Sequence, residues 1–132
     1  KGYEYISYIS SKATVCGNEI GENCFILEDN TIQPFVTISD NVTLWSGNHI
    51  GHHSTIKSHC FISSHVVVSG GVTIEEQCFL GVNSTLRDGI TIGEKSVIGA
   101  GAIILGNVDP NGVYIAGKTE RSRLPSNKLR GI

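Results

Sequence analysis

Aliphatic residues recur every six positions along most of this chain. From Ile20 to Asp109 the sequence divides into fifteen consecutive six-residue units without an insertion or a deletion. Each unit opens with one of these residues: Ile20, Ile26, Ile32, Ile38, Leu44, Ile50, Ile56, Ile62, Val68, Ile74, Leu80, Leu86, Ile92, Ile98 and Ile104. Such a strict period indicates an array of equivalent structural units.

The residue four places after each opener is also restricted, and it is mostly small or β-branched. A period of six suits neither a helix, with 3.6 residues per turn, nor an alternating strand, unless the chain turns a corner in every unit. Three units then close a triangular coil of eighteen residues, and successive coils stack as parallel strands about 4.8 Å apart. We therefore predict an all-β fold, a left-handed parallel β-helix of five coils over residues 20–109.

Both ends of the chain depart from this register. In residues 1–19 the six-residue step holds from Ile9 to Val15, but the next step, to Ile20, is five. We expect a run-in and a partial first coil there and, because the chain lacks methionine, an upstream part that has been removed. Residues 110–132 are predicted to be a C-terminal cap and tail, with a short strand at 113–115 and a short helix near 126–130.

Charge and cysteine content add two expectations. The net charge is −2, but residues 118–132 carry five basic residues and one acidic residue, so this tail could meet phosphate or simply be solvated. Cys24, Cys60 and Cys78 share one interior column, where free thiols are favoured over a disulfide. With no apolar run long enough to span a membrane and no signal peptide, the sequence predicts a cytoplasmic location.

Five histidines lie within seventeen residues: His49, His52, His53, His59 and His65. Such a cluster first suggests a metal site. However, His53, His59 and His65 each occupy the fourth place of successive units, so they fall on three different corners of the tube. They cannot converge within one subunit, and we expect no metal, although a metal shared between subunits remains an alternative.

His52 is the best candidate for a catalytic base. The residue eighteen positions later, directly over it on the next coil, is Gly70, and Gly70-Gly71 leaves that corner without side chains. An imidazole beside exposed backbone N–H groups provides a base for an incoming nucleophile and a donor for the carbonyl oxygen, as acyl transfer from a thioester requires. The alternative is an ordinary solvated corner histidine.

Three segments resemble one group of enzymes: residues 46–54 (SGNHIGHHS), 61–65 (FISSH) and 79–84 (FLGVNS). They are similar to hexapeptide-repeat acyltransferases of the sialic-acid O-acetyltransferase and nucleotide-sugar N-acetyltransferase type. The resemblance implies a homotrimer with acetyl-CoA in the groove between neighbouring tubes and a sugar or nucleotide-sugar acceptor. It also implies an upstream α/β domain that binds the nucleotide sugar.

By position, the resemblance gives His52 the role of catalytic base and makes the N–H of Gly70 the donor that faces the thioester oxygen. It places Val82 and Ala100 along the cofactor, with acyl transfer direct and without an acyl-enzyme. Ser64 and His65 are expected near the acetyl group or the pantetheine arm. Phe61 stands where a relative has a cofactor-contacting histidine, and His53 stands where relatives often carry an acidic residue, which leaves open what orients His52.

Two other functions stay as alternatives. A trimeric β-helix hydratase resembling the γ-type carbonic anhydrases would need a histidine pair five apart and a third histidine two coils away, and the sequence has neither. A non-catalytic role, in which the β-helix only trimerises another domain, would make His52 dispensable. The acceptor atom, the sugar and the length of the acyl chain cannot be read from these residues.

Overall fold

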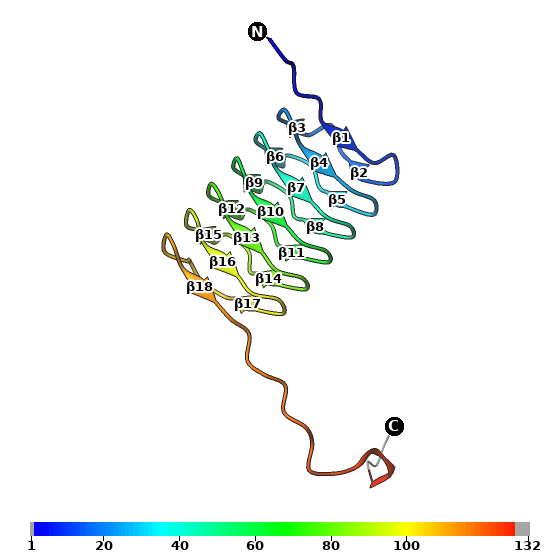
Figure 1. The fold of residues 1–132 in the computed structure, drawn as a ribbon, viewed down its shortest axis with the longest axis vertical. Coiled ribbons are helices and arrows are strands. Elements are labelled where there is room, and N and C mark those ends of the chain that lie inside the picture. Colours follow the sequence, from blue (N-terminus) through cyan, green and yellow to red (C-terminus); the bar gives the residue numbers. More distant parts are fainter. Residues whose placement is uncertain (1, 129–132) are drawn as a thin grey trace.

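The computed structural model describes residues 2–128, and over this range the chain forms a left-handed parallel β-helix (Figure 1). The two-residue strands form three sheets, which we call A, B and C. Sheet A contains β1 (Tyr8–Ile9), β4 (Phe25–Ile26), β7 (Thr43–Leu44), β10 (Phe61–Ile62), β13 (Phe79–Leu80), β16 (Val97–Ile98) and β18 (Val113–Tyr114). Sheet B contains β2 (Thr14–Val15), β5 (Thr31–Ile32), β8 (His49–Ile50), β11 (Val67–Val68), β14 (Thr85–Leu86) and β17 (Ile103–Ile104). Sheet C contains β3 (Glu19–Ile20), β6 (Thr37–Ile38), β9 (Thr55–Ile56), β12 (Thr73–Ile74) and β15 (Thr91–Ile92).

Each strand pairs in parallel with the strand one coil away, and the predicted register of eighteen is confirmed. Ile26 pairs with Leu44 in sheet A, and Ile20 pairs with Ile38 in sheet C. The first coil is one residue shorter, because Ile9 pairs with Ile26. The five-residue step after Val15 accounts for this difference. The ladder therefore begins before residue 20, in the segment predicted to be a partial coil.

The aliphatic openers fill the interior. Those from Ile26 to Ile104 are all buried, and twelve of them rank among the largest side chains that are fully enclosed. The second inward position holds mostly Cys, Val, Ser and Asn, whose small volumes suit the narrow tube; Ile90 and Ala102 complete the set. Because each coil buries its apolar side chains against its neighbours, the fold needs no separate globular core.

The backbone conformation of the corners between strands explains why histidines recur at intervals of six residues. The third residue of most corners has a positive φ, including His53 (φ 58), His59 (φ 64) and His65 (φ 57). Asn and Asp hold the equivalent place on other corners, for example Asn41 (φ 58). These residue types are the ones most tolerant of the left-handed region. The three histidines therefore recur at a backbone position that favours them, on three different corners as predicted.

The cysteines of the interior column are free thiols, as expected. The sulfur of Cys60 donates to the carbonyl of Glu75 at 3.0 Å, and the sulfur of Cys78 donates to the carbonyl of Gly93 at 3.1 Å. Burial raises the pKa of the Cys24 thiol. These side chains act as small interior residues with satisfied S–H groups.

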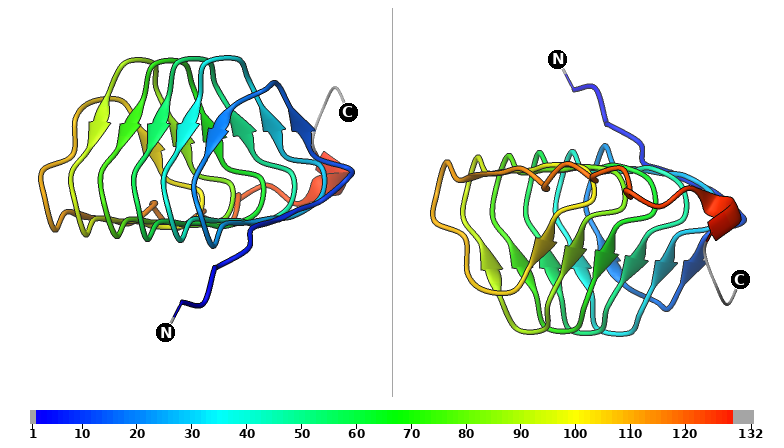
Figure 2. Two further views of the ribbon diagram at one scale, coloured as in Figure 1. Left: turned by 90° about the horizontal axis from the view of Figure 1, so that it is seen from above. Right: turned by 90° about the horizontal axis from the view of Figure 1, so that it is seen from below.

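The last coil is closed by β18 and by a parallel bridge between Ile92 and Val108. Beyond Ala116, residues 117–128 are exposed and run outside the stack of coils (Figures 1 and 2). In the described part of the tail, the chain therefore leaves the last coil instead of covering it. The predicted short helix is a 3-10 helix, η1 (Ser126–Lys128), and the rest of its predicted range lies outside the described residues. Within residues 2–128, no helix is long and apolar enough to cross a membrane.

Candidate active site

The corner between sheets B and C, which we call corner BC, brings His52 and Gly70 together. A Cβ built on Gly70 would lie 2.7 Å from both Cε1 and Nε2 of His52, so the imidazole rests against the Gly70 Cα. Any side chain at position 70 would displace the ring. The predicted vertical contact between these two residues is therefore present, and it requires glycine.

His53 is the direct partner of the His52 ring. The two Nδ1 atoms lie 3.0 Å apart, and the backbone N–H of His52 donates to Oε1 of Gln33 at 2.9 Å. One Nδ1 must carry the proton of the shared hydrogen bond. When His52 is the donor, its Nε2 is left as an unprotonated acceptor beside Gly70, as a general base requires. His53 thus supplies the orienting contact that the sequence left open.

The side chain of Asp88 accepts a hydrogen bond from the backbone N–H of Gly70, the group that the sequence predicted to face the thioester oxygen. The acceptor atom is Oδ1, at 3.0 Å. The same kind of hydrogen bond, which we call an aspartate cap, occurs on the corner between sheets C and A. There, Oδ1 of Asp40 accepts the N–H of Glu22, the residue eighteen positions before it, at 2.8 Å. In this structure the Gly70 N–H is therefore not available as the sequence predicted, because an aspartate on the next coil reaches back to it.

The second group of predicted residues lies on the corner between sheets A and B, called corner AB. Ser64, Val82 and Ala100 follow one another along it at intervals of eighteen, and Val82 and Ala100 are exposed. The His65 side chain points toward the preceding coil and not toward Val82. A Cβ on Gly47 would lie 2.6 Å from its Cε1 and Nδ1, so the ring covers Gly47.

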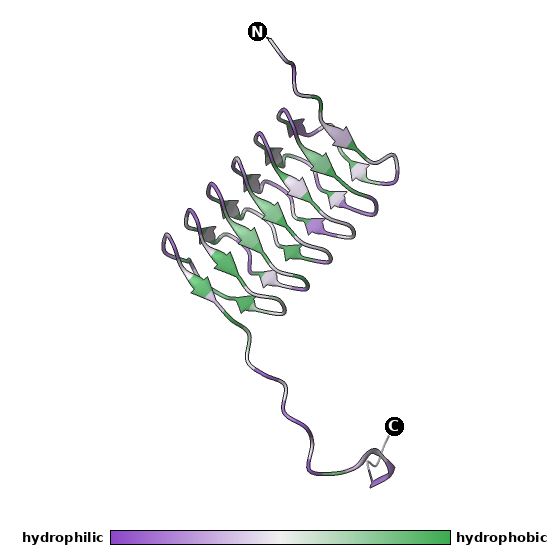
Figure 3. Cartoon of the chain, viewed as in Figure 1, coloured by the Kyte–Doolittle hydropathy of each residue, from purple (hydrophilic) through white to green (hydrophobic). Residues whose placement is uncertain are grey.

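Phe61 lies on neither corner. It stands on the outer face of sheet A, where its ring stacks on that of Phe79 with centroids 5.6 Å apart, and Trp45 lies 6.4 Å from it on the other side. Figure 3 shows the apolar character of most strands in this sheet. Phe61 thus belongs to an aromatic surface that borders corner AB.

The two corners do not meet within one chain, because the width of sheet B lies between them. The structure brings together His52, His53 and Gly70 on one corner, and Ser64, His65, Val82 and Ala100 on the other. Among residues 2–128, no group of three or more His, Cys, Asp and Glu side chains could hold a metal ion. A single tube thus presents two separated halves of the predicted site.

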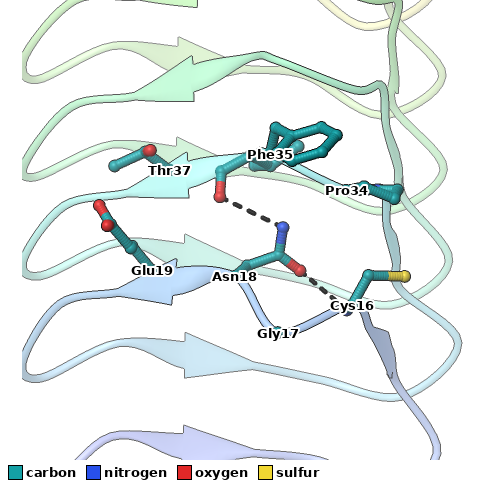
Figure 4. A pocket seen from close by; sticks show the side chains of 8 residues that line it. Cys16, Gly17, Asn18, Glu19, Pro34, Phe35 and Thr37 are labelled. Atoms are coloured by element: carbon teal, nitrogen blue, oxygen red, sulfur yellow. Dashed lines mark hydrogen bonds between the residues drawn. The ribbon is translucent and has the colours of Figure 1, made fainter.

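Corner BC also carries a pocket that the sequence did not predict (Figure 4). It has a volume of about 460 Å³ and is lined by Cys16, Gly17, Asn18, Glu19, Pro34, Phe35, Val36 and Thr37. Phe35 is 73% exposed, has a φ of 65° and packs against His53 with ring centroids 4.8 Å apart. An aromatic residue in the left-handed region is uncommon, and such strain concentrates at functional sites. The five-residue step after Val15 was the available signal of this irregular corner.

Comparisons with known protein families also identify the six-residue repeat. Residues 35–70 match a family model described as bacterial transferase hexapeptide (six repeats). Residues 71–105 match a model described as the hexapeptide repeat of succinyl-transferase. No curated protein sequence matches the chain.

Several solved structures share this fold. PerB from Caulobacter crescentus, solved with CoA and GDP-perosamine, has a TM-score of 0.86 and 24% identity over 87% of this chain and 56% of that chain. The acetyltransferase domain of PglB from Neisseria gonorrhoeae, in complex with acetyl coenzyme A, has a TM-score of 0.84 and 24% identity over 87% of this chain and 57% of that chain. AntD from Bacillus cereus, in complex with dTDP and 3-hydroxybutyryl-CoA, has a TM-score of 0.78 and 18% identity over 86% of this chain and 79% of that chain. The chain thus spans a little over half the length of the first two structures.

Proposed function

Because the chain belongs to the hexapeptide-repeat family of bacterial transferases, we propose that it transfers an acetyl group from acetyl-CoA to an amino or hydroxyl group of a nucleotide-linked sugar. The observation that carries this proposal is the contact between the His52 imidazole and the bare backbone of Gly70. It provides a base next to exposed backbone at a corner open to solvent. The CoA and nucleotide-sugar complexes of the structural neighbours support the same class of substrates.

In the proposed reaction, the acceptor nitrogen or oxygen attacks the acetyl carbon while Nε2 of His52 takes its proton. The carbonyl oxygen becomes an oxyanion, and the N–H of Gly70 donates to it once the Asp88 carboxylate has moved away. Collapse of this intermediate breaks the carbon–sulfur bond, and the departing CoA thiolate receives the proton from the imidazolium. The acyl group never resides on the protein.

A thiol-release assay tests this function. The intact protein is incubated with acetyl-CoA and a panel of nucleotide-linked amino sugars and sialic acid, and free CoA is measured. We expect acceptor-dependent release with at least one member of the panel. Absence of release with every acceptor, or stoichiometric zinc in the purified protein, would contradict the proposal.

Asp88 is expected to restrain the reaction, because its carboxylate competes for the Gly70 N–H and places a negative charge where the oxyanion forms. Replacing Asp88 by alanine should raise kcat/KM for acetyl-CoA by about three- to tenfold. The matched control is Asp40→Ala, which removes the same kind of cap on a corner distant from His52. A lower kcat/KM in Asp88→Ala than in the control would assign the carboxylate a supporting role instead.

We also propose that the active unit is a homotrimer, in which one chain supplies corner BC and its neighbour supplies corner AB. The outer face of sheet A supports this assembly, since Phe25, Phe61, Phe79 and Val97 are 46%, 37%, 42% and 39% exposed. An exposed apolar surface of this kind marks a site of association. Three buried free thiols, in turn, fit a reducing compartment such as the cytoplasm.

Charge placed on sheet A tests the trimer. Phe79→Lys should convert it to monomers, measured by light scattering, and abolish activity, because each monomer retains only half of each site. Thr91→Lys makes the matched change on the outer face of sheet C and should leave the trimer intact. A Phe79→Lys protein that stays trimeric and fully active would place the interface elsewhere.

A further inference from the structure

Phe35 stands at a place where the other corners of the tube carry polar residues. It is the third residue of its corner and has a φ of 65°, in the left-handed region. Among residues 2–128, the other non-glycine residues with a positive φ are Asn, Asp, Gln, Lys and His, so Phe35 alone has an apolar side chain there. Short polar side chains tolerate this region, whereas a bulky side chain is strained in it. Burial does not offset that strain, because Phe35 is 73% exposed.

The Phe35 ring lies against His53, the residue directly over it on the next coil. The two ring centroids are 4.8 Å apart, and the ring planes are inclined by 31°. In the following coil the same column continues with Gly71, where an added Cβ would have only the Gly89 Cα within 4 Å. The His53 ring therefore does not lie over Gly71. It leans toward the preceding coil and rests on Phe35.

The two residues before Phe35 hold the backbone of the same pair of histidines. The N–H of His53 donates to the carbonyl of Pro34 at 3.3 Å. The N–H of His52 donates to Oε1 of Gln33 at 2.9 Å. Three successive residues of one coil thus supply a carbonyl, a side-chain oxygen and an aromatic ring to two histidines of the next coil. Of these three contacts, the aromatic ring is the one that acts on a histidine side chain.

The contact between the two imidazoles depends on the orientation of His53. The rings of His52 and His53 stand at 86° to each other, and their Nδ1 atoms are 3.0 Å apart. Rotation of the His53 side chain would carry its Nδ1 away from His52 and break this contact. Packing against Phe35 restricts that rotation.

We propose that Phe35 is a positioning residue, which holds the His53 ring so that its Nδ1 faces Nδ1 of His52. This inference rests on the proposed function. When Nε2 of His52 takes the proton of the acceptor, the ring becomes an imidazolium, and its Nδ1–H donates to the lone pair on Nδ1 of His53. That hydrogen bond becomes charge-assisted, so it strengthens as the proton is transferred. His53 stays neutral, and the proton leaves from Nε2 of His52 to the CoA thiolate.

The test replaces Phe35 by asparagine, the residue type at the same place of other corners, such as Asn41. Asparagine tolerates the left-handed region, so the free energy of unfolding in urea should equal or exceed that of the native protein. In the CoA-release assay, kcat should nonetheless fall about tenfold, with KM for acetyl-CoA within about twofold of the native value. Phe35→Tyr keeps an aromatic face and should retain the native kcat within about twofold. A native kcat in Phe35→Asn would overturn the inference.

The ¹⁵N NMR spectrum of the intact protein with labelled histidines gives a readout that needs no acceptor. At a pH at which both rings are neutral, we expect a protonated Nδ1 on His52 in the native protein and in Phe35→Tyr. In Phe35→Asn the Nδ1 signal should move toward that of an unprotonated nitrogen. An unchanged signal would overturn the inference whatever the activity. The expected shift, in a protein that releases CoA with no acceptor of the panel, would overturn the proposed function and support the positioning contact.

A double-variant cycle separates an action through His53 from a direct contact with the acceptor. His53→Gly removes the imidazole, and glycine accepts the φ of 58° at that position. In this background the Phe35 ring has no imidazole to hold, so adding Phe35→Asn should change kcat by less than about twofold. A further loss of about tenfold would show that the ring acts on the acceptor itself, and it would overturn the inference.

Discussion

Replacing His52 by alanine is expected to lower the rate of acyl transfer by about 10²- to 10⁴-fold, the usual contribution of a positioned general base. The affinity for acetyl-CoA should stay within about twofold of the native value, because the predicted cofactor-lining residues lie on the other corner. The imidazole is exposed, and its removal opens no cavity in the core. The measurement is CoA release at saturating acetyl-CoA and acceptor, together with calorimetric binding of acetyl-CoA.

His59→Ala is the matched control. His59 is also an exposed corner histidine in the left-handed region, but it lies on the corner between sheets C and A. Its replacement should leave the rate within about twofold of the native value. Undiminished release by His52→Ala would remove His52 as the base, and an equal loss in both variants would point to a general effect of corner substitutions on the fold.

The sequence alone was sufficient for the architecture, because the six-residue period leaves few ways to bury the openers. Once a coil of eighteen residues is accepted, adding eighteen identifies vertical neighbours, and this simple rule found the contact between His52 and Gly70. The same rule placed Val82 and Ala100 on a corner different from that of His52. Backbone periodicity therefore fixes which residues are adjacent along each corner.

The rule of adding eighteen does not predict hydrogen bonds made by side chains. Asp88 is two coils from His52 in the same column, yet nothing in the period indicates that its carboxylate turns back to the Gly70 N–H. The Nδ1 contact between His52 and His53 likewise depends on two rotamers, and not on the register. These choices decide the chemistry of the site, and they require the three-dimensional arrangement of the side chains.

The irregular first coil limited the prediction in a different way. A five-residue step between Val15 and Ile20 indicated a break, but it did not show how the chain would close around it. In the structure, Gly17 takes a φ of 67° and the Asn18 amide donates to the carbonyls of Gln33 and Val36. The pocket beside Phe35 follows from these local contacts, for which the repeat offers no template.

The second large effect is expected inside the tube, where Asn48→Ala should lower the free energy of unfolding by about 2–3 kcal/mol. Asn48 is fully enclosed, and its Oδ1 accepts the N–H of Val66 at 2.8 Å. Alanine would leave that buried N–H without a partner and would add a small void. The carbonyl of Trp45 would keep a partner, because the Asn30 side chain also donates to it at 2.7 Å.

Ser84→Ala is the control in the same interior column, two coils further along. Its Oγ is buried without a hydrogen-bond partner, so alanine removes an unsatisfied group and should leave stability unchanged or raise it by up to about 1 kcal/mol. Both variants are compared with the native protein by urea denaturation at one protein concentration, so that the proposed assembly would contribute equally to each measurement. If burial of a small polar side chain alone set stability, the two replacements would shift the midpoint equally. Opposite or clearly unequal shifts are expected, because the Asn48 side chain makes a hydrogen bond to the next coil and the Ser84 side chain makes none.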